Sequence, residues 1–250
     1  MQQTMVIPLL PDFPKILGVS ADDASWLVTD RTVGASQGAF AFGNLAVHVG
    51  DAPEAVAANR AQLADRLGVE QVVFTRAAHS RDVEYVDSVV ADVPDRDGLV
   101  TDRLDLAIAA QGADCAMIGM ATADGWIAAV HCGWQGLVRG VVASAIERMV
   151  AAGSTVQAPL AHVGPTICAQ CYPVDAERAQ QVAAVAPRAA VEIGGRPAVD
   201  LRAGLASQFE ELGIAATWDP RCTAQSPQLY SHRRDGRTGR QALAILRRSA

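Results

Sequence analysis

Residues 112–137 read GADCAMIGMATADGWIAAVHCGWQGL, in which two apolar runs flank the polar segment TADG. Asp-Gly between apolar runs is a strong hairpin signal, because glycine accepts the positive φ that tight turns need. A four-residue loop at 122–125 would pair Cys115 with Cys132, and a loop one residue different would set Cys115 opposite His131. Directly paired Cβ atoms lie roughly 4.5–5.5 Å apart. The hairpin therefore predicts a thiol and an imidazole close together at its open end.

The flanking segments alternate between helical and strand patterns. Asp51 as N-cap and Pro53 in the first turn begin a helix that Gly68 ends, and strongly apolar residues predict one helix over 137–152. Further helices are expected at 175–185 and 200–212, each with an aspartate as N-cap, and strands and turns at 26–50. Strands are expected at 71–75, 104–111, 160–163, 190–193, 214–218 and 241–246, and loops at 87–97 and 231–240. Interleaved helices and strands without a linker predict one mixed α/β (α+β) domain over 1–250, with 1–20 as an N-terminal extension.

Composition narrows the class of protein. The chain has 250 residues, half of them apolar, which is enough for a substantial core. A net charge of −6 argues against nucleic acid or an anionic membrane as the main partner. No apolar run approaches the ~20 residues of a membrane span, and the N-terminus lacks the basic region of a signal peptide. The chain has five cysteines, an odd number, so free thiols rather than a set of disulfides are expected. We therefore expect a cytoplasmic protein, and we expect it to be a monomer or a small homo-oligomer.

Three potential metal ligands fall at the ends of predicted strands: His79, Cys115 and His131. Imidazole nitrogen and thiolate sulfur suit zinc, and three protein ligands with an open fourth position are the catalytic pattern. A second interpretation needs no metal, with Cys115 as nucleophile and His131 as its base. The spacing alone leaves both interpretations open.

Six motifs, in order along the chain, favour the metal site over the metal-free interpretation. The motifs DRTVGASQG, GNLAVHVGD, ADC, AVHCGWQGL, GPTICAQCY and SHRRDGRTGR stand at 30–38, 43–51, 113–115, 129–137, 164–172 and 231–240. The sequence resembles the laccase-domain family of bacterial polyphenol oxidase proteins, whose usual phrases include QVHG, TADC, AHAGWRGL, IGP…CYEV and S(Y/H)RRDG.TGR. The resemblance implies layered mixed sheets flanked by helices and a zinc site formed by His79, Cys115 and His131, which would be the catalytic residues as well.

The resemblance also implies an activity on purine nucleosides: phosphorolysis of adenosine, inosine or methylthioadenosine, with adenosine deamination as a further possibility. Phosphorolysis needs an anion site, for which the N–H groups of Gly133 and Gly136 and the guanidinium groups of Arg233, Arg234 and Arg240 are candidates. Two residues in the earlier motifs, Arg31 and Asn44, are expected to bind substrate, and His48 to line the same pocket.

The chain departs from the family phrases at three positions, with Ala77 and Ser80 around His79 and Gln135 in place of arginine. Because the departures alter the substrate-facing residues, three alternatives stay open: laccase-like polyphenol oxidation, a Cys-His hydrolase that edits peptidoglycan precursors, and a zinc-stabilised interaction module. Copper is less expected than zinc, since five scattered histidines cannot supply a multicopper site. For Cys168 and Cys171, packing is the first expectation.

Overall fold

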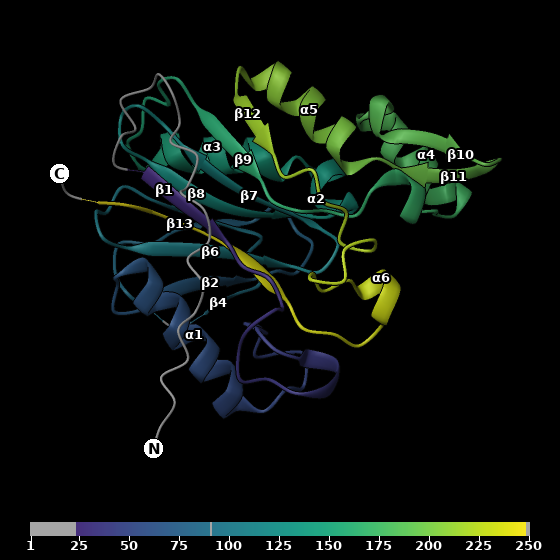
Figure 1. The fold of residues 1–250 in the computed structure, drawn as a ribbon. Coiled ribbons are helices and arrows are strands. Elements are labelled where there is room, and N and C mark those ends of the chain that lie inside the picture. The colour runs from purple at the N-terminus through teal and green to yellow at the C-terminus, as the bar shows by residue number, and fades with distance from the viewer. Residues whose placement is uncertain (1–23, 91, 249–250) are drawn as a thin grey trace.

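Two β-sheets packed face to face, with helices on both outer faces, form the protein (Figure 1). The computed structural model describes residues 24–90 and 92–248, so the expected N-terminal extension lies outside the described residues. The five-stranded sheet has the order β1 (Ala24–Val28), β13 (Gln241–Arg247), β6 (Ala107–Gly112), β2 (Val72–Arg76), β4 (Val93–Pro94). The six-stranded sheet has the order β12 (Ala215–Trp218), β9 (Leu160–Val163), β7 (Ala116–Ala121), β8 (Ile127–Cys132), β5 (Gly98–Thr101), β3 (Val83–Tyr85). A separate hairpin pairs β10 (Ala190–Ile193) with β11 (Arg196–Val199).

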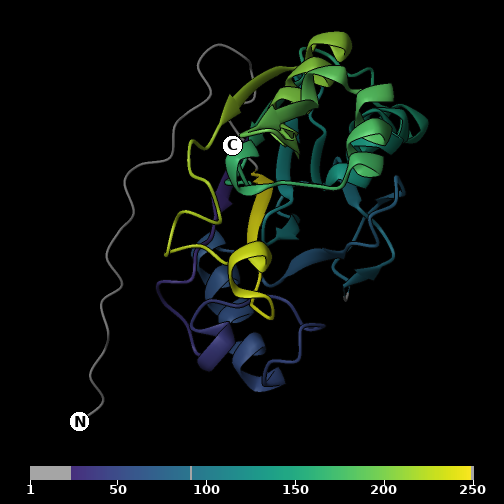
Figure 2. The same cartoon turned by 90° about the vertical axis from the view of Figure 1, so that its right-hand side faces the viewer.

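Helix α1 (Pro53–Leu67) covers the outer face of the five-stranded sheet, and the other long helices lie over the six-stranded sheet (Figure 1). Those helices are α2 (Trp134–Arg139), α3 (Val141–Ala152), α4 (Ala176–Val185) and α5 (Leu201–Leu212). A short helix, α6 (His232–Asp235), lies between the block of α4, β10 and β11 and the segment that holds the 3-10 turn Gly38–Phe40 (Figure 2). The mixed α/β fold of layered sheets agrees with the sequence-based expectation.

Side-chain alternation explains the layers. In β13, Leu243 and Ile245 point into the core between the sheets, whereas Ala244 and Leu246 pack under α1. Both faces of this strand are buried, which is why its sequence is almost continuously apolar. The sheets approach closely at Gly119 in β7, where an added Cβ would lie 2.7 Å from Leu243 Cδ2.

The hairpin forms as expected, but both expected registers are wrong. Ala121 pairs with Ile127, so Ala116, not Cys115, is opposite Cys132. The cause is a five-residue connection, in which the backbone N–H of Thr122 donates to the Trp126 carbonyl at 2.9 Å and the Trp126 N–H donates to Thr122 Oγ1 at 3.1 Å. Cys115 comes immediately before β7 and stays beside the end of β8.

Two helix predictions need correction. The single helix expected over 137–152 is two helices, because Gly140 takes the left-handed conformation between α2 and α3. The expected N-cap Asp51 is wrong as well: Ala52 is the N-cap of α1, and the Asp51 carboxylate accepts hydrogen bonds from Ser36 and Asn44.

Short strands account for other differences. The polar segment 87–97, expected as a loop, contains β4 and is flanked by β3 and β5. The strand expected at 190–193 is β10, and a further strand, β11, follows it. The segment 231–240, expected as a loop, contains α6. Within residues 24–90 and 92–248, no helix combines the length and apolar character needed to cross a bilayer.

Candidate metal centre

The fold brings His79, Cys115 and His131 together at one end of the two sheets. His79 follows β2, Cys115 lies between β6 and β7, and His131 is in β8. One ligand atom from each lies within 4.8 Å of the other two, and the two imidazole rings meet edge to face with centroids 5.1 Å apart. Gly133 permits this approach, since a Cβ there would lie 2.9 Å from Cys115 Sγ.

Asp97 orients two of these residues, although the sequence analysis did not single it out. Its fully buried carboxylate contacts His131 Nδ1 at 2.9 Å. Because a carboxylate only accepts, Nδ1 carries the proton and Nε2 of His131 is the nitrogen left for a metal. Carboxylate–histidine pairs of this kind are the usual outer support of a metal-ligating histidine.

The same carboxylate shapes the turn that carries His79. Asp97 accepts backbone N–H bonds from Ala78 at 3.1 Å, from His79 at 3.1 Å and from Ser80 at 2.7 Å. The Ser80 hydroxyl adds a bond at 2.9 Å, and Arg139 donates to the His79 carbonyl. Together these bonds hold His79 at a φ of +57°, which a non-glycine residue rarely adopts. Ser80, a departure from the family phrase, thus supports the turn.

A second aspartate performs a comparable role for Cys115. Asp114 has a φ of +113°. Its carboxylate accepts hydrogen bonds from the Thr223 hydroxyl at 2.6 Å, the Ser231 hydroxyl at 2.7 Å and the backbone N–H of Arg233 at 2.7 Å. The last motif of the chain therefore holds the residue that precedes Cys115, and the wide sequence separation explains why spacing gave no sign of it.

The electrostatics favour an ionised pair. Burial opposes ionisation of the Cys115 thiol, but His131 and His79 outweigh it and lower the pKa of Cys115 to about 6. Burial likewise opposes protonation of His131, yet the Cys115 thiolate and Asp97 raise the pKa of His131 to about 10. A thiolate beside two imidazoles fits a thiophilic divalent ion such as zinc, because the ion can take the place of the ring proton as the thiolate's positive partner.

A cavity of about 320 Å³ opens from these three residues. It lies at the carboxyl ends of the parallel strands β2 and β6, where α/β folds commonly bind ligands. Its lining comprises His48, Thr75, Ala77, His79, Gln111, Gly112, Ala113, Cys115, His131, His232 and Arg240. Within the described part of the chain, Thr75 Oγ1 and Gln111 Oε1 are buried without a hydrogen-bond partner. Both residues line the cavity, so two polar groups without a partner in the protein lie next to the space where a ligand would bind.

The other predicted site residues lie around this cavity rather than in it. Asn44 is buried, and its side chain bonds to the backbone of Ala46 and Arg240 and to the Asp51 carboxylate. Gly136 is buried where an added Cβ would lie 3.2 Å from Val141, so it permits helix packing.

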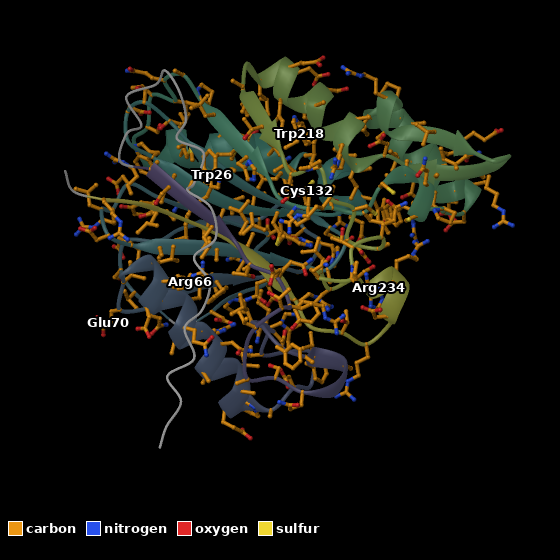
Figure 3. All side chains as sticks on the ribbon, in the orientation of Figure 1. Trp26, Arg66, Glu70, Cys132, Trp218 and Arg234 are labelled. Atoms are coloured by element: carbon orange, nitrogen blue, oxygen red, sulfur yellow. The ribbon has the colours of Figure 1, made fainter. Side chains whose placement is uncertain are left out.

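The predicted arginines also have other partners. Arg31 donates to the Ala41 carbonyl and pairs with Asp235 at 3.2 Å. The Arg234 guanidinium, on α6 (Figure 3), donates to the carbonyls of Thr223, Ser226 and Leu229. The Arg233 side chain donates to the Pro173 carbonyl and stacks on Tyr172. Arg240 is the arginine that lines the cavity.

Comparison with known proteins shows which family the chain belongs to. The family described as Multi-copper polyphenol oxidoreductase laccase matches residues 25–248. A purine nucleoside phosphorylase of Mycobacterium tuberculosis is 44% identical over 88% of this chain and 90% of its own length, and one of Streptomyces griseus is 40% identical over 88% and 92%.

Solved structures are similar as well. A Neisseria meningitidis protein superposes with a TM-score of 0.82 at 29% identity over 95% of this chain and 98% of that chain. YlmD from Geobacillus stearothermophilus gives 0.83 at 26% identity over 95% and 99%. With the family match across nearly all described residues and relatives above 40% identity, the chain belongs to the multi-copper polyphenol oxidoreductase laccase family.

Proposed function

We propose that this protein is a purine nucleoside phosphorylase that depends on one zinc ion held by His79, Cys115 and His131. The observation that carries the proposal is that these three ligands line a cavity with unsatisfied polar atoms and an arginine. The names of the Mycobacterium and Streptomyces relatives support the reaction type. The substrates would be adenosine, inosine or methylthioadenosine, with inorganic phosphate, in the cytoplasm.

Several cavity residues have a part in the proposed reaction. Phosphate adds an oxygen to the anomeric carbon of the ribose while the bond to the purine nitrogen breaks, and the leaving base takes up a proton. The Arg240 guanidinium supplies the positive charge that phosphate needs. Thr75 and Gln111 line the cavity, and a rotation of either side chain would let its unpartnered oxygen accept a hydrogen bond from the sugar hydroxyls or the base amino group. When bound, zinc would act as a Lewis acid that polarises a substrate oxygen.

His232 is the proposed proton donor to the leaving base. Its Nδ1 lies 2.8 Å from the Gly236 carbonyl, which only accepts, so Nδ1 is the donor in this bond and Nε2 is the nitrogen left to face the base. His48 is less suited, because burial and the charge of Arg240 lower the pKa of its imidazole. Gly133 serves the ligands by its small size, and Gly136 permits close helix packing. Arg31, Asn44, Arg233 and Arg234 act on the site through the loops they hold.

Adenosine deamination is a second candidate, because three protein ligands are the pattern of metal-assisted hydrolysis. Oxidation of phenols, which the family description names, is a third candidate and would rest on a single copper ion in place of zinc, since the histidines cannot supply a multicopper site. The hydrolase alternative, with Cys115 as nucleophile, rests on the lowered pKa of the Cys115 thiol and on the adjacent His131.

One experiment separates these reactions. Metal-analysed protein is incubated with adenosine, with and without phosphate, and the products are identified. Adenine and ribose 1-phosphate formed only with phosphate support phosphorolysis, whereas inosine formed without phosphate means deamination. If His79→Ala keeps full activity while Cys115→Ala abolishes it, the zinc proposal is wrong and a cysteine nucleophile is favoured.

A further inference from the structure

A second group of potential ligands lies outside the cavity. Cys168 and Cys171 stand at the two ends of the short segment that contains the 3-10 turn Ala169–Cys171, and Cys222 belongs to the loop after β12. Their three sulfur atoms all lie within 4.8 Å of one another. Cys222 is buried and the other two are half-buried, and none of the three lines the cavity beside His79.

The backbone holds the three cysteines in place without any ligand. Thr166 and Cys222 form an isolated parallel bridge that joins the two segments. The Cys171 N–H donates to the Cys168 carbonyl at 3.0 Å, and the Ser226 N–H donates to the Cys222 carbonyl at 2.9 Å. Arg234 reinforces the second segment through its bonds to the carbonyls that follow Cys222. The convergence of the sulfurs therefore results from the fold of both segments.

Hydrogen bonds and charge favour a thiolate at one corner of the cluster. The Cys168 N–H donates to Cys222 Sγ at 3.3 Å, as backbone amides do to metal-bound thiolates. Although burial opposes it, this bond and the amides of Gln225 and Ala224 lower the pKa of the Cys222 thiol. Burial and the neighbouring sulfurs raise the pKa of Cys171. A thiolate at Cys171 therefore needs a cation between the sulfurs.

We propose that Cys168, Cys171 and Cys222 form a second metal site, which binds a thiophilic closed-shell ion, Zn²⁺ or Cu⁺, through three thiolates. Tetrahedral zinc with Zn–S bonds of about 2.3 Å requires sulfurs about 3.8 Å apart, within the limit that the structure sets. The remaining thiol protons are released to solvent when the ion binds. A disulfide would use two of the sulfurs and leave the third unexplained.

The position of this cluster gives it a structural consequence. Thr223, next to Cys222, donates to the Asp114 carboxylate, and Thr166 donates to the Asp114 carbonyl at 2.7 Å. Both segments that carry the cysteines thus hold the residue that orients Cys115. A metal that joins them would stabilise this support without contacting the substrate.

Metal stoichiometry tests the proposal independently of enzyme activity. Full-length protein is reduced, stripped with chelator and titrated anaerobically with Zn²⁺ or Cu⁺, and bound metal is counted after gel filtration. We expect two zinc ions in the wild type and one in His79→Ala/His131→Ala, which lacks the first site. Adding Cys168→Ser/Cys222→Ser to this double variant should remove the last ion, whereas adding Cys132→Ala should not.

Alkylation supplies a readout that does not depend on the folding of a variant. In the wild-type chain, bound zinc should protect Cys168 and Cys171 from iodoacetamide at least tenfold, as mass spectrometry of peptides would record. The proposal is overturned if the His79→Ala/His131→Ala protein binds neither ion while its three thiols are reduced. It is equally overturned if bound metal leaves the alkylation rates unchanged, or if a Cys168–Cys171 disulfide forms in air despite saturating zinc.

Discussion

Asp97→Asn should weaken zinc binding at the His79–Cys115–His131 site by about 10–100-fold, because this carboxylate supports two of the three ligands. One oxygen accepts from the Ala78 and Ser80 N–H groups and the Ser80 hydroxyl, and the other accepts from His79 and His131. Asparagine keeps one such oxygen and turns an NH₂ group toward the other donors.

The magnitude follows from the number of bonds that the substitution removes. In either orientation of the amide, at least two donors lose their acceptor. At about 1.5 kcal/mol for each bond to a charged group, the free energy of unfolding of the metal-free protein should fall by about 3 kcal/mol. The loss of zinc affinity corresponds to a further ~1.4–2.7 kcal/mol in the metal-bound form.

The assay is competition for zinc against a chromophoric chelator, with thermal unfolding measured on the same samples. All proteins carry Cys222→Ser, so that the titration reports on one site. Asp124→Asn is the matched control, since its carboxylate accepts bonds from Ser154, Thr155 and Gln157 in a distant turn. It should lower stability and leave zinc affinity unchanged. The reasoning fails if Asp97→Asn binds zinc within twofold of the parent, or if both variants lose affinity equally.

Three further predictions concern the cavity and the hairpin. Gly133→Ala should lower zinc affinity about tenfold, because the new Cβ meets Cys115 Sγ at 2.9 Å. It should cost little stability, because the φ of −87° at Gly133 suits any residue. Unchanged affinity in the chelator competition would contradict this prediction. Gln111→Leu should raise KM for the nucleoside about three- to tenfold without lowering Tm, because Oε1 lacks a partner in the free protein; steady-state kinetics and calorimetry check both, and a lower Tm with unchanged KM would refute it. Hydrogen bonds, against the effect of burial, hold the pKa of Asp124 below its usual range, so its stabilisation is complete above the unfolded value of about 3.9 and is lost as the pH falls toward the folded value. The difference in urea unfolding free energy between wild type and Asp124→Asn should therefore shrink from pH 5 to pH 2, and a constant difference would be inconsistent with this origin.

Local signals in the sequence were enough to predict that Cys115 and His131 lie close together. An Asp-Gly turn between apolar runs brings Cys115 near His131, short apolar runs predict most strands, and aspartate caps predict the helices α4 and α5. The exact register depends on a five-residue connection closed by two bonds between Thr122 and Trp126, which the pattern of apolar residues does not encode.

The supporting residues could not be predicted in this way, because their partners are distant in sequence. Asp97 lies in a polar loop and reaches His131 only after β5 has paired with β8. Arg234 and Arg240 look equivalent in the motif SHRRDGRTGR, and both guanidinium groups donate to backbone carbonyls, yet only Arg240 of the two lines the cavity. The different positions of Arg234 and Arg240 therefore result from the tertiary structure and not from the local sequence.

The most direct test measures phosphate-dependent release of adenine from adenosine against zinc occupancy in chelator-stripped protein that carries Cys222→Ser. If His79, Cys115 and His131 hold the catalytic ion, the rate rises in proportion to bound zinc, reaches its maximum at one ion per chain, and stays at background when Cys115→Ser is added. Full activity in the stripped protein, or in the added Cys115→Ser variant, would contradict the account.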